Sequence, residues 1–100
     1  MSGNHEKVLL DLNYSEFQSV LFDLDVPDIK KMFKTLKNVK NMTWQEVFQD
    51  HGLKWEELKS VPEKFTIRLS QSHRAVVARD GSFMRFLVLS PDHDAAYGKK

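Results

Sequence analysis

The fold of this chain is decided by residues 64–89, which read KFTIRLSQSHRAVVARDGSFMRFLVL. Apolar and polar residues alternate over residues 65–69, which is the period of a half-buried strand. Residues 74–79 and 82–89 have the same strand-forming character. The Asp80-Gly81 pair between them is typical of a type I′ hairpin turn. This stretch therefore predicts an antiparallel meander of three strands.

A two-residue turn at Asp80-Gly81 fixes which side chains share a face of the hairpin, because paired residues lie on the same side. One face is then apolar and forms the core, with Ala75, Val77, Met84, Phe86 and Val88. The other face is open and holds Arg68, Arg74, Val76, Arg85, Leu87 and Leu89. Arg74 and Arg85 are diagonal neighbours in this register. Three arginines there predict a phosphate-binding face, since guanidinium groups bind phosphate bidentately. The alternative is an ordinary solvated face.

The residues before the meander predict one short strand and three helices. Residues 7–12 read as a strand, and Ser15 with Gln18 has the spacing of a capping box for a helix that extends to Leu24. Pro27 ends this helix and opens the next one. Thr43 and Glu46 predict a second capping box, for a helix ending near Gly52. Residues 53–60 fit either a helical turn or the lead-in to a strand.

The second predicted helix has two unlike faces. Its apolar positions recur at helical spacing and are Ile29, Met32, Phe33, Leu36 and Val39. Its polar positions are lysines, namely Lys30, Lys31, Lys34, Lys37 and Lys40. The simplest interpretation is a solvated outer face. The other is an additional electrostatic contact with RNA or the ribosome.

The whole chain predicts one α+β domain, in which an N-terminal strand and a helical hairpin pack on a C-terminal antiparallel sheet. Its 100 residues fit a single domain over 1–100, with residues 1–5 and 98–100 expected to be flexible. There is no cysteine, no membrane-length apolar run and no signal-like start, so a cytoplasmic protein without a membrane partner is expected.

Charge is distributed unevenly along the chain. Residues 1–63 carry 8 Lys/Arg against 11 Asp/Glu, whereas residues 64–100 carry 7 against 3. A basic C-terminal part indicates an acidic partner or phosphate.

The segment after the last predicted strand contains side chains that can move protons. His93 is the natural proton shuttle near neutral pH, with Asp92 beside it and Tyr97 one helical turn later. The alternative is a hydrogen-bonded turn without catalytic role. The spacing fits no metal site, and no cofactor is expected.

The residues from Phe65 to Tyr97 resemble the C-terminal half of RelE-like toxins of toxin–antitoxin systems. The matching pieces are FTIRL at 65–69, RAVV at 74–77, RDG at 79–81, RFL at 85–87 and PDHDAAY at 91–97, with TWQEV at 43–47 and GLKWE at 52–56 typical of one branch. The resemblance implies a single small RelE-like toxin domain. In this branch a histidine is expected where Ser90 stands, so this position is either a lost catalytic group or a tolerated variant.

The resemblance also implies an activity and partners. The activity is metal-independent endoribonuclease cleavage of mRNA, on the ribosome, which inhibits translation. The partners are a cognate antitoxin, mRNA and the ribosome, with DNA contacted only through the antitoxin. By the family's pattern Lys64, Arg68 and Arg74 fall where basic residues bind the scissile phosphate, Tyr97 falls near the C-terminal tyrosine and His93 in the region that supplies an Arg or His. Together with the residue chemistry above, we expect His93, Tyr97, Arg74 and Arg68 to be catalytic, and Lys64, Arg85 and Asp92 to bind the substrate. The alternatives are a ParE-like or inactive member that acts by protein binding, for example on gyrase, and a plain RNA-binding module.

Overall fold

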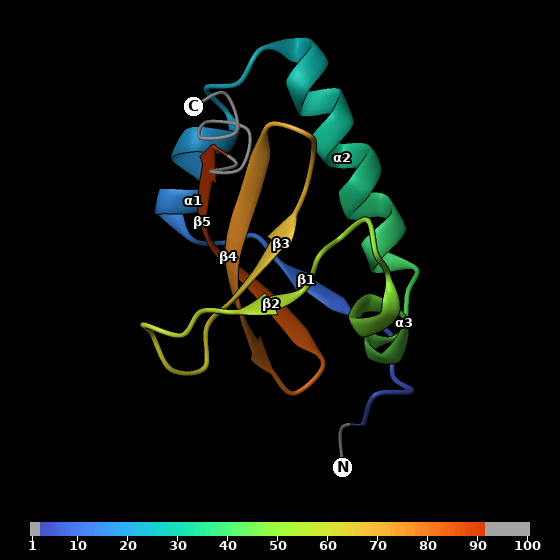
Figure 1. Cartoon of the computed structure of the whole chain (residues 1–100). Helices are drawn as coiled ribbons and strands as arrows, with labels where there is room; N and C mark the ends of the chain where they lie inside the picture. The colour runs from blue at the N-terminus through green and yellow to red at the C-terminus, as the bar shows by residue number, and fades with distance from the viewer. Residues whose placement is uncertain (1–2, 92–100) are drawn as a thin grey trace.

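The computed structural model describes residues 3–91 of the chain, and Figure 1 shows their arrangement. Helices lie in the first half and most of the sheet in the second, as the sequence predicts. The elements are β1 (Leu9–Asp11), α1 (Ser15–Leu21), α2 (Val26–Lys40), α3 (Trp44–Gln49), β2 (Glu56–Glu57), β3 (Phe65–Arg68), β4 (His73–Asp80) and β5 (Phe83–Pro91).

The strands form one sheet in the order β1-β5-β4-β3-β2. β3, β4 and β5 pair antiparallel, which confirms the predicted meander. β1 joins the edge beside β5 in a parallel pairing, and β2 pairs antiparallel with β3 at the other edge. The α+β class predicted from the sequence is confirmed.

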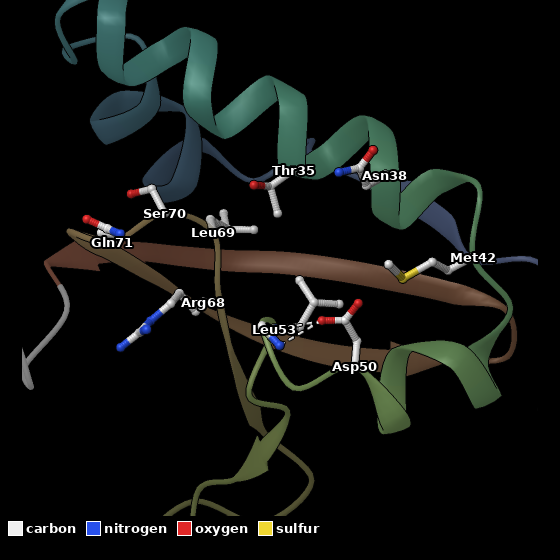
Figure 2. Close-up of a pocket in the computed structure, with 10 residues that line it drawn as sticks. Thr35, Asn38, Met42, Asp50, Leu53, Arg68, Leu69, Ser70 and Gln71 are labelled. Atoms are coloured by element: carbon white, nitrogen blue, oxygen red, sulfur yellow. Dashed lines mark hydrogen bonds between the residues drawn. The ribbon is translucent and has the colours of Figure 1, made fainter.

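The hydrophobic core lies between the helices and one face of the sheet. Figure 2 shows α1 and α2 on the same side of the strands. The Phe17 ring of α1 packs against the Phe86 ring of β5, with 5.4 Å between their centroids. The buried side chains that the sheet contributes are Ile67, Ala75, Val77, Met84, Phe86 and Leu89. The opposite face of the sheet has no described helix over it and is called the open face below.

The helix predictions are confirmed in part. The Thr43–Glu46 capping box is present, with the Glu46 amide donating to the Thr43 hydroxyl at 3.2 Å and the Thr43 amide donating to the Glu46 carboxylate at 2.8 Å. The capping box predicted at Ser15 is wrong. The Gln18 side chain instead donates to the Leu12 carbonyl oxygen at 2.7 Å, and the helix begins at Ser15 itself.

Three further predicted helix features differ in the structure. The first helix, α1, ends at Leu21 and does not extend to Leu24. Phe33 was expected on the apolar face of α2 but is 48% exposed. The buried residues of this helix are Met32, Leu36 and Val39, and Phe33 lies about 100° around the helix from Met32, beside this stripe. The third helix ends at Gln49, before the expected Gly52. There the Asp50 carboxylate accepts hydrogen bonds from the Gly52 and Leu53 amides and starts a turn.

The hairpin register differs from the predicted one. Asp80 pairs with Phe83, so the turn residues are Gly81 and Ser82 rather than Asp80 and Gly81. Gly81 has φ of 62°, and a positive φ at the first central residue is what a type II′ turn requires. The partners of β4 therefore shift by two residues along β5. A shift of two preserves the faces, so Arg74 and Arg85 still lie on the open face.

A bulge in β5 changes the faces further along the hairpin. Val77 pairs with Phe86 but Val76 pairs with Val88, so Leu87 is an extra residue. Beyond this point the alternation reverses. Leu89, predicted on the open face, is buried, and Val88, predicted in the core, is 37% exposed. Ser90 consequently lies opposite Arg74.

Arg79 contacts residues 3 and 4, near the start of the described part of the chain. Its guanidinium lies 4.2 Å from the Trp44 ring centroid and donates to the Asn4 side chain at 2.9 Å. It also donates to the Gly3 carbonyl oxygen at 3.3 Å. Arg79 is thus engaged in packing away from the arginines of the open face.

Candidate nucleic-acid interface

Three polar residues form one row across the open face of the sheet. Arg68 of β3 pairs with Arg74 of β4, and Arg74 pairs with Ser90 of β5. Directly paired residues share a face and have Cβ atoms about 5 Å apart. The next row on this face holds Thr66, Val76 and Val88. The sequence prediction that Arg68 and Arg74 share the open face is therefore confirmed.

Arg74 is held by neighbours on β2 and β3. Its Nη2 atom donates to the Thr66 hydroxyl at 2.6 Å and to the Lys54 carbonyl oxygen at 3.3 Å. The same atom lies 3.5 Å from the Glu56 carboxylate. The Arg74 side chain is 13% exposed, whereas that of Glu56 is 67% exposed. The guanidinium is thus fixed in direction, with an accessible carboxylate beside it.

Glu56 is a member of this site that the sequence prediction missed. It lies on β2, and its pairing with Thr66 places it on the open face. β2 has only two residues, which is too short for an alternating pattern to reveal. The preceding segment is fixed by a hydrogen bond of 2.6 Å from the Arg68 amide to the Leu53 carbonyl oxygen. Lys54 turns the chain there with a φ of 52°.

Lys64 and Arg68 lie at the two ends of β3, about 13 Å apart at strand spacing. Lys64 directly precedes the strand, is half-buried, and accepts a backbone hydrogen bond of 2.8 Å from the Leu58 amide. Arg68 ends the strand, and Figure 2 shows its side chain pointing away from α2. Of these two, Arg68 is the one that is paired with Arg74.

Arg85 belongs to a separate ion-pair cluster. It pairs with Ala78, four residues along β4 from Arg74, which is about 13 Å at strand spacing. The predicted proximity of Arg74 and Arg85 is therefore wrong, because the turn lies one residue later than expected. Arg85 instead contacts the carboxylates of Asp80 at 2.7 Å and Asp11 at 3.3 Å. Hydrogen bonds with Asp80 and then Tyr14 raise the pKa of Arg85 above its ordinary value.

The predicted residues Asp92, His93 and Tyr97 lie outside the described residues, so their roles stay predictions. The described part of β5 ends at Pro91, which pairs with His73. This pair is the row next to Arg74 and Ser90. Within residues 3–91, no group of three or more His, Cys, Asp or Glu side chains is placed to hold a metal ion. None of the described helices is both long and apolar enough to cross a membrane.

Comparison with known proteins gives matches among solved structures. No family model matches the chain, and neither does any curated protein. The chain is similar to one in the crystal structure of the archaeal RelE–RelB complex from Pyrococcus horikoshii OT3. The TM-score is 0.63 and the identity 11%, over 86% of this chain and 96% of that one.

Two structures from Staphylococcus aureus are similar as well. A chain of the YoeB dimer gives a TM-score of 0.55 at 16% identity, over 83% of this chain and 94% of that one. A chain of the YoeB–YefM complex gives 0.53 at 17% identity, over 85% and 97%. At such identities the similarity defines the fold. The protein has a RelE-like fold, as its sequence predicts.

Proposed function

We propose that this protein is the toxin of a toxin–antitoxin pair and acts as an endoribonuclease that cleaves mRNA on the ribosome. The observation that carries the proposal is the Arg68–Arg74 pair on the open face, with Glu56 beside it. Two guanidinium groups supply the cationic donors that a phosphate in reaction requires. The RelE-like fold supports the same activity.

The reaction needs no nucleophile from the protein, since the RNA 2′-hydroxyl attacks the adjacent 3′-phosphate. A bond forms between the 2′-oxygen and phosphorus, and the bond from phosphorus to the 5′-oxygen breaks. A base takes the 2′-hydroxyl proton and an acid returns a proton to the leaving 5′-oxygen. Each such transfer contributes on the order of 10²–10⁴ in rate.

The described residues supply the cations that bind the phosphate and the base that takes the 2′-hydroxyl proton. Arg68 and Arg74 bind the phosphate oxygens and stabilise the negative charge that develops there. Glu56 is assigned as the proton acceptor. Its exposed carboxylate lies 3.5 Å from the Arg74 guanidinium, and so beside the place where the phosphate would bind. His93 acts as the acid, with Asp92 orienting it and Tyr97 contacting the substrate. These last three roles rest on the sequence and on the resemblance, since the three residues lie outside the described part of the chain.

The antitoxin is proposed to cover the open face and thereby block access to Arg68 and Arg74. Two of the similar structures described above are complexes with a second protein, RelB in one and YefM in the other. A partner with acidic residues fits the basic C-terminal part of the chain. DNA is contacted only through the antitoxin, and the pair acts in the cytoplasm.

A second candidate function is inhibition by protein binding without RNA cleavage, in the manner of ParE-like proteins. Ser90 favours this function, because it stands in the same row as Arg74 where a catalytic histidine is expected. A hydroxyl at this place cannot shuttle a proton near neutral pH.

Induction of the chain without its antitoxin separates the two functions. RNA cleavage predicts that protein synthesis stops before DNA synthesis, with new 5′ ends inside ribosome-bound mRNA. The variant Arg68→Ala should lose these ends. Gyrase inhibition predicts early DNA damage and intact mRNA, and that result would contradict the proposed cleavage.

A further inference from the structure

The outer face of α2 carries a concentration of positive charge that the proposed cleavage site does not account for. No Asp or Glu occurs between residues 29 and 45, while this stretch contains five lysines. Four of them follow one another at intervals of three residues and form what is called here the lysine row, Lys31, Lys34, Lys37 and Lys40. All four are exposed, and successive members are about 4.5 Å apart along the helix axis. Because each step of three residues also turns by about 60°, the lysine row crosses the exposed side of α2 obliquely, from the flank of Lys31 to that of Lys40.

Two arginines of the open face already form ion pairs with carboxylates. Arg74 lies beside the Glu56 carboxylate, and Arg85 lies between those of Asp11 and Asp80. Among residues 3–91, by contrast, no carboxylate forms an ion pair with a member of the lysine row. A cation that is already paired releases fewer counterions when it meets a phosphate chain. The lysine row is therefore expected to contribute more to the electrostatic affinity for RNA than Arg74 does.

A groove connects the lysine row with the site. One pocket of about 430 Å³ lies between Lys31 and Lys34 of α2 and the turn formed by residues 69–72. A second pocket of about 300 Å³, shown in Figure 2, continues it to Arg68 at the end of β3, whose side chain points away from α2. The two pockets share Thr35, Leu69, Ser70 and Gln71. Hydroxyl and amide groups that can bind phosphate and ribose thus line the connection.

We propose that the lysine row and this groove bind the single-stranded RNA that flanks the cleaved bond. This inference rests on the proposed function for the identity of the RNA, and it adds a second surface outside the reaction site. The RNA backbone leaves Arg68, passes over the turn at 69–72 and continues along α2. The row spans about 14 Å, which is long enough for several successive phosphates.

An acidic helix of a partner protein is the competing occupant, and the distribution of apolar residues disfavours it. Such a helix needs a continuous apolar strip beneath it. Within residues 30–40 of α2, Phe33 is the one large apolar side chain that is exposed. Val26, exposed as well, lies about two turns before Phe33 on the same side of α2, beside Asp25. The exposed Phe22 precedes the helix beside Asp23, so the apolar strip does not continue past Phe33 among the lysines. One aromatic ring among lysines suits base stacking better.

The test measures RNA binding by the variant Lys31→Gln/Lys34→Gln/Lys37→Gln. The probe is a short uridine-rich RNA with 2′-O-methyl groups, which binds but cannot be cut by 2′-hydroxyl attack. Each lost contact to single-stranded RNA lowers the slope of log affinity against log salt by about 0.7, so the slope should fall by about 2. At ~0.1 M salt this corresponds to roughly 100-fold weaker binding.

Two controls make this result specific. Arginine at the same three positions keeps the charge and should bind like the parent chain. Lys59→Gln removes one exposed cation from the loop after β2. It should change the slope by no more than about 0.7, the value for one contact. Thermal unfolding of all variants should agree closely, because exposed substitutions change stability by about 0.5 kcal/mol or less.

The outcomes separate this inference from the proposed function. An unchanged slope in the glutamine variant would overturn the inference, even if the parent chain cuts RNA. Loss of antitoxin binding with RNA binding intact would also overturn it and assign the lysine row to a protein partner. RNA binding that depends on the row, in a chain that cuts no RNA, would support the inference and contradict the nuclease. With cleavable RNA, the variant should show a raised KM and the parental kcat.

Discussion

Replacement of Glu56 by Gln tests the assignment of a base on the open face. The amide has nearly the same shape as the carboxylate but cannot accept the 2′-hydroxyl proton. If Glu56 is the base, the cleavage rate should fall by about 10²-fold or more, since general base catalysis contributes on the order of 10²–10⁴. The RNA affinity should not fall, because the lost charge is negative.

The structure limits how much of this loss can come from unfolding. Glu56 is 67% exposed and its carboxylate is 3.5 Å from Arg74, which describes a solvent-screened ion pair. Such pairs contribute about 0–1 kcal/mol. For a domain of this size the midpoint of thermal unfolding should therefore fall by at most roughly 4–8 °C. A rate loss of 100-fold at an assay temperature well below that midpoint is chemical in origin.

The assay compares Glu56→Gln with Glu57→Gln, the next residue on the same strand. Both are exposed, but Glu57 pairs with Phe65 and thus lies on the other face of the sheet. Initial rates on a ribosome-bound mRNA are measured beside thermal unfolding for each variant. Glu57→Gln should cut at the parental rate. Parental cleavage by Glu56→Gln would refute the assignment, and equal losses in both variants would assign the effect to the stability of β2.

Three further predictions concern the arginines, Ser90 and metal. Arg74→Ala should abolish cleavage and lower the free energy of unfolding by about 1.5–3 kcal/mol, because its charged hydrogen bond to Thr66 is lost. Arg85→Ala should reduce cleavage far less, since Arg85 lies with Asp11 and Asp80; equal losses by both variants would contradict the separation of the two clusters. Ser90→His should raise the cleavage rate by about tenfold or more, as an added acid or base beside Arg74 would, and an unchanged rate would mark Ser90 as a tolerated variant. EDTA should leave cleavage of free RNA by the purified chain unchanged, because the proposed reaction uses arginines where a metal would otherwise act; free RNA is used since EDTA removes the Mg²⁺ that ribosomes need.

The sequence predicted the strands well and their register less well, for reasons visible at the hairpin. Alternation identified β3, β4 and β5, because a buried face imposes a period of two. The position of the turn depends on a single residue, and Gly81-Ser82 competes with Asp80-Gly81 as the central pair. The bulge at Leu87 leaves no mark in the composition of the strand. It nevertheless decides that Leu89, and not Val88, enters the core.

The same limits apply to the site. Arg68 and Arg74 could be predicted to share a face, since each alternates with buried neighbours on its own strand. Glu56 could not, because β2 is defined by its pairing with β3 and not by any pattern of its own. One signal was present, namely a pair of glutamates directly after Trp55, whose ring stacks on Phe65 at 4.6 Å. This stacking holds the segment that carries Glu56 against the edge strand of the meander.

Under the proposed function, charge pairing would let one small sheet orient a phosphate without holding the protein on any RNA that it meets. Arg74 is fixed by Thr66 and the Lys54 carbonyl oxygen, and its charge is partly neutralised by Glu56. A guanidinium held in this way loses little conformational freedom when it binds. Because its charge is partly neutralised, it would orient the phosphate more than it would strengthen RNA binding. Affinity then has to come from cations that are not paired in the free protein, and the described residues offer such cations in the lysine row of α2. A chain with acidic partners on α2 as well would orient RNA correctly but bind it too weakly to cut it, whereas unpaired arginines on the sheet would bind any phosphate in several orientations.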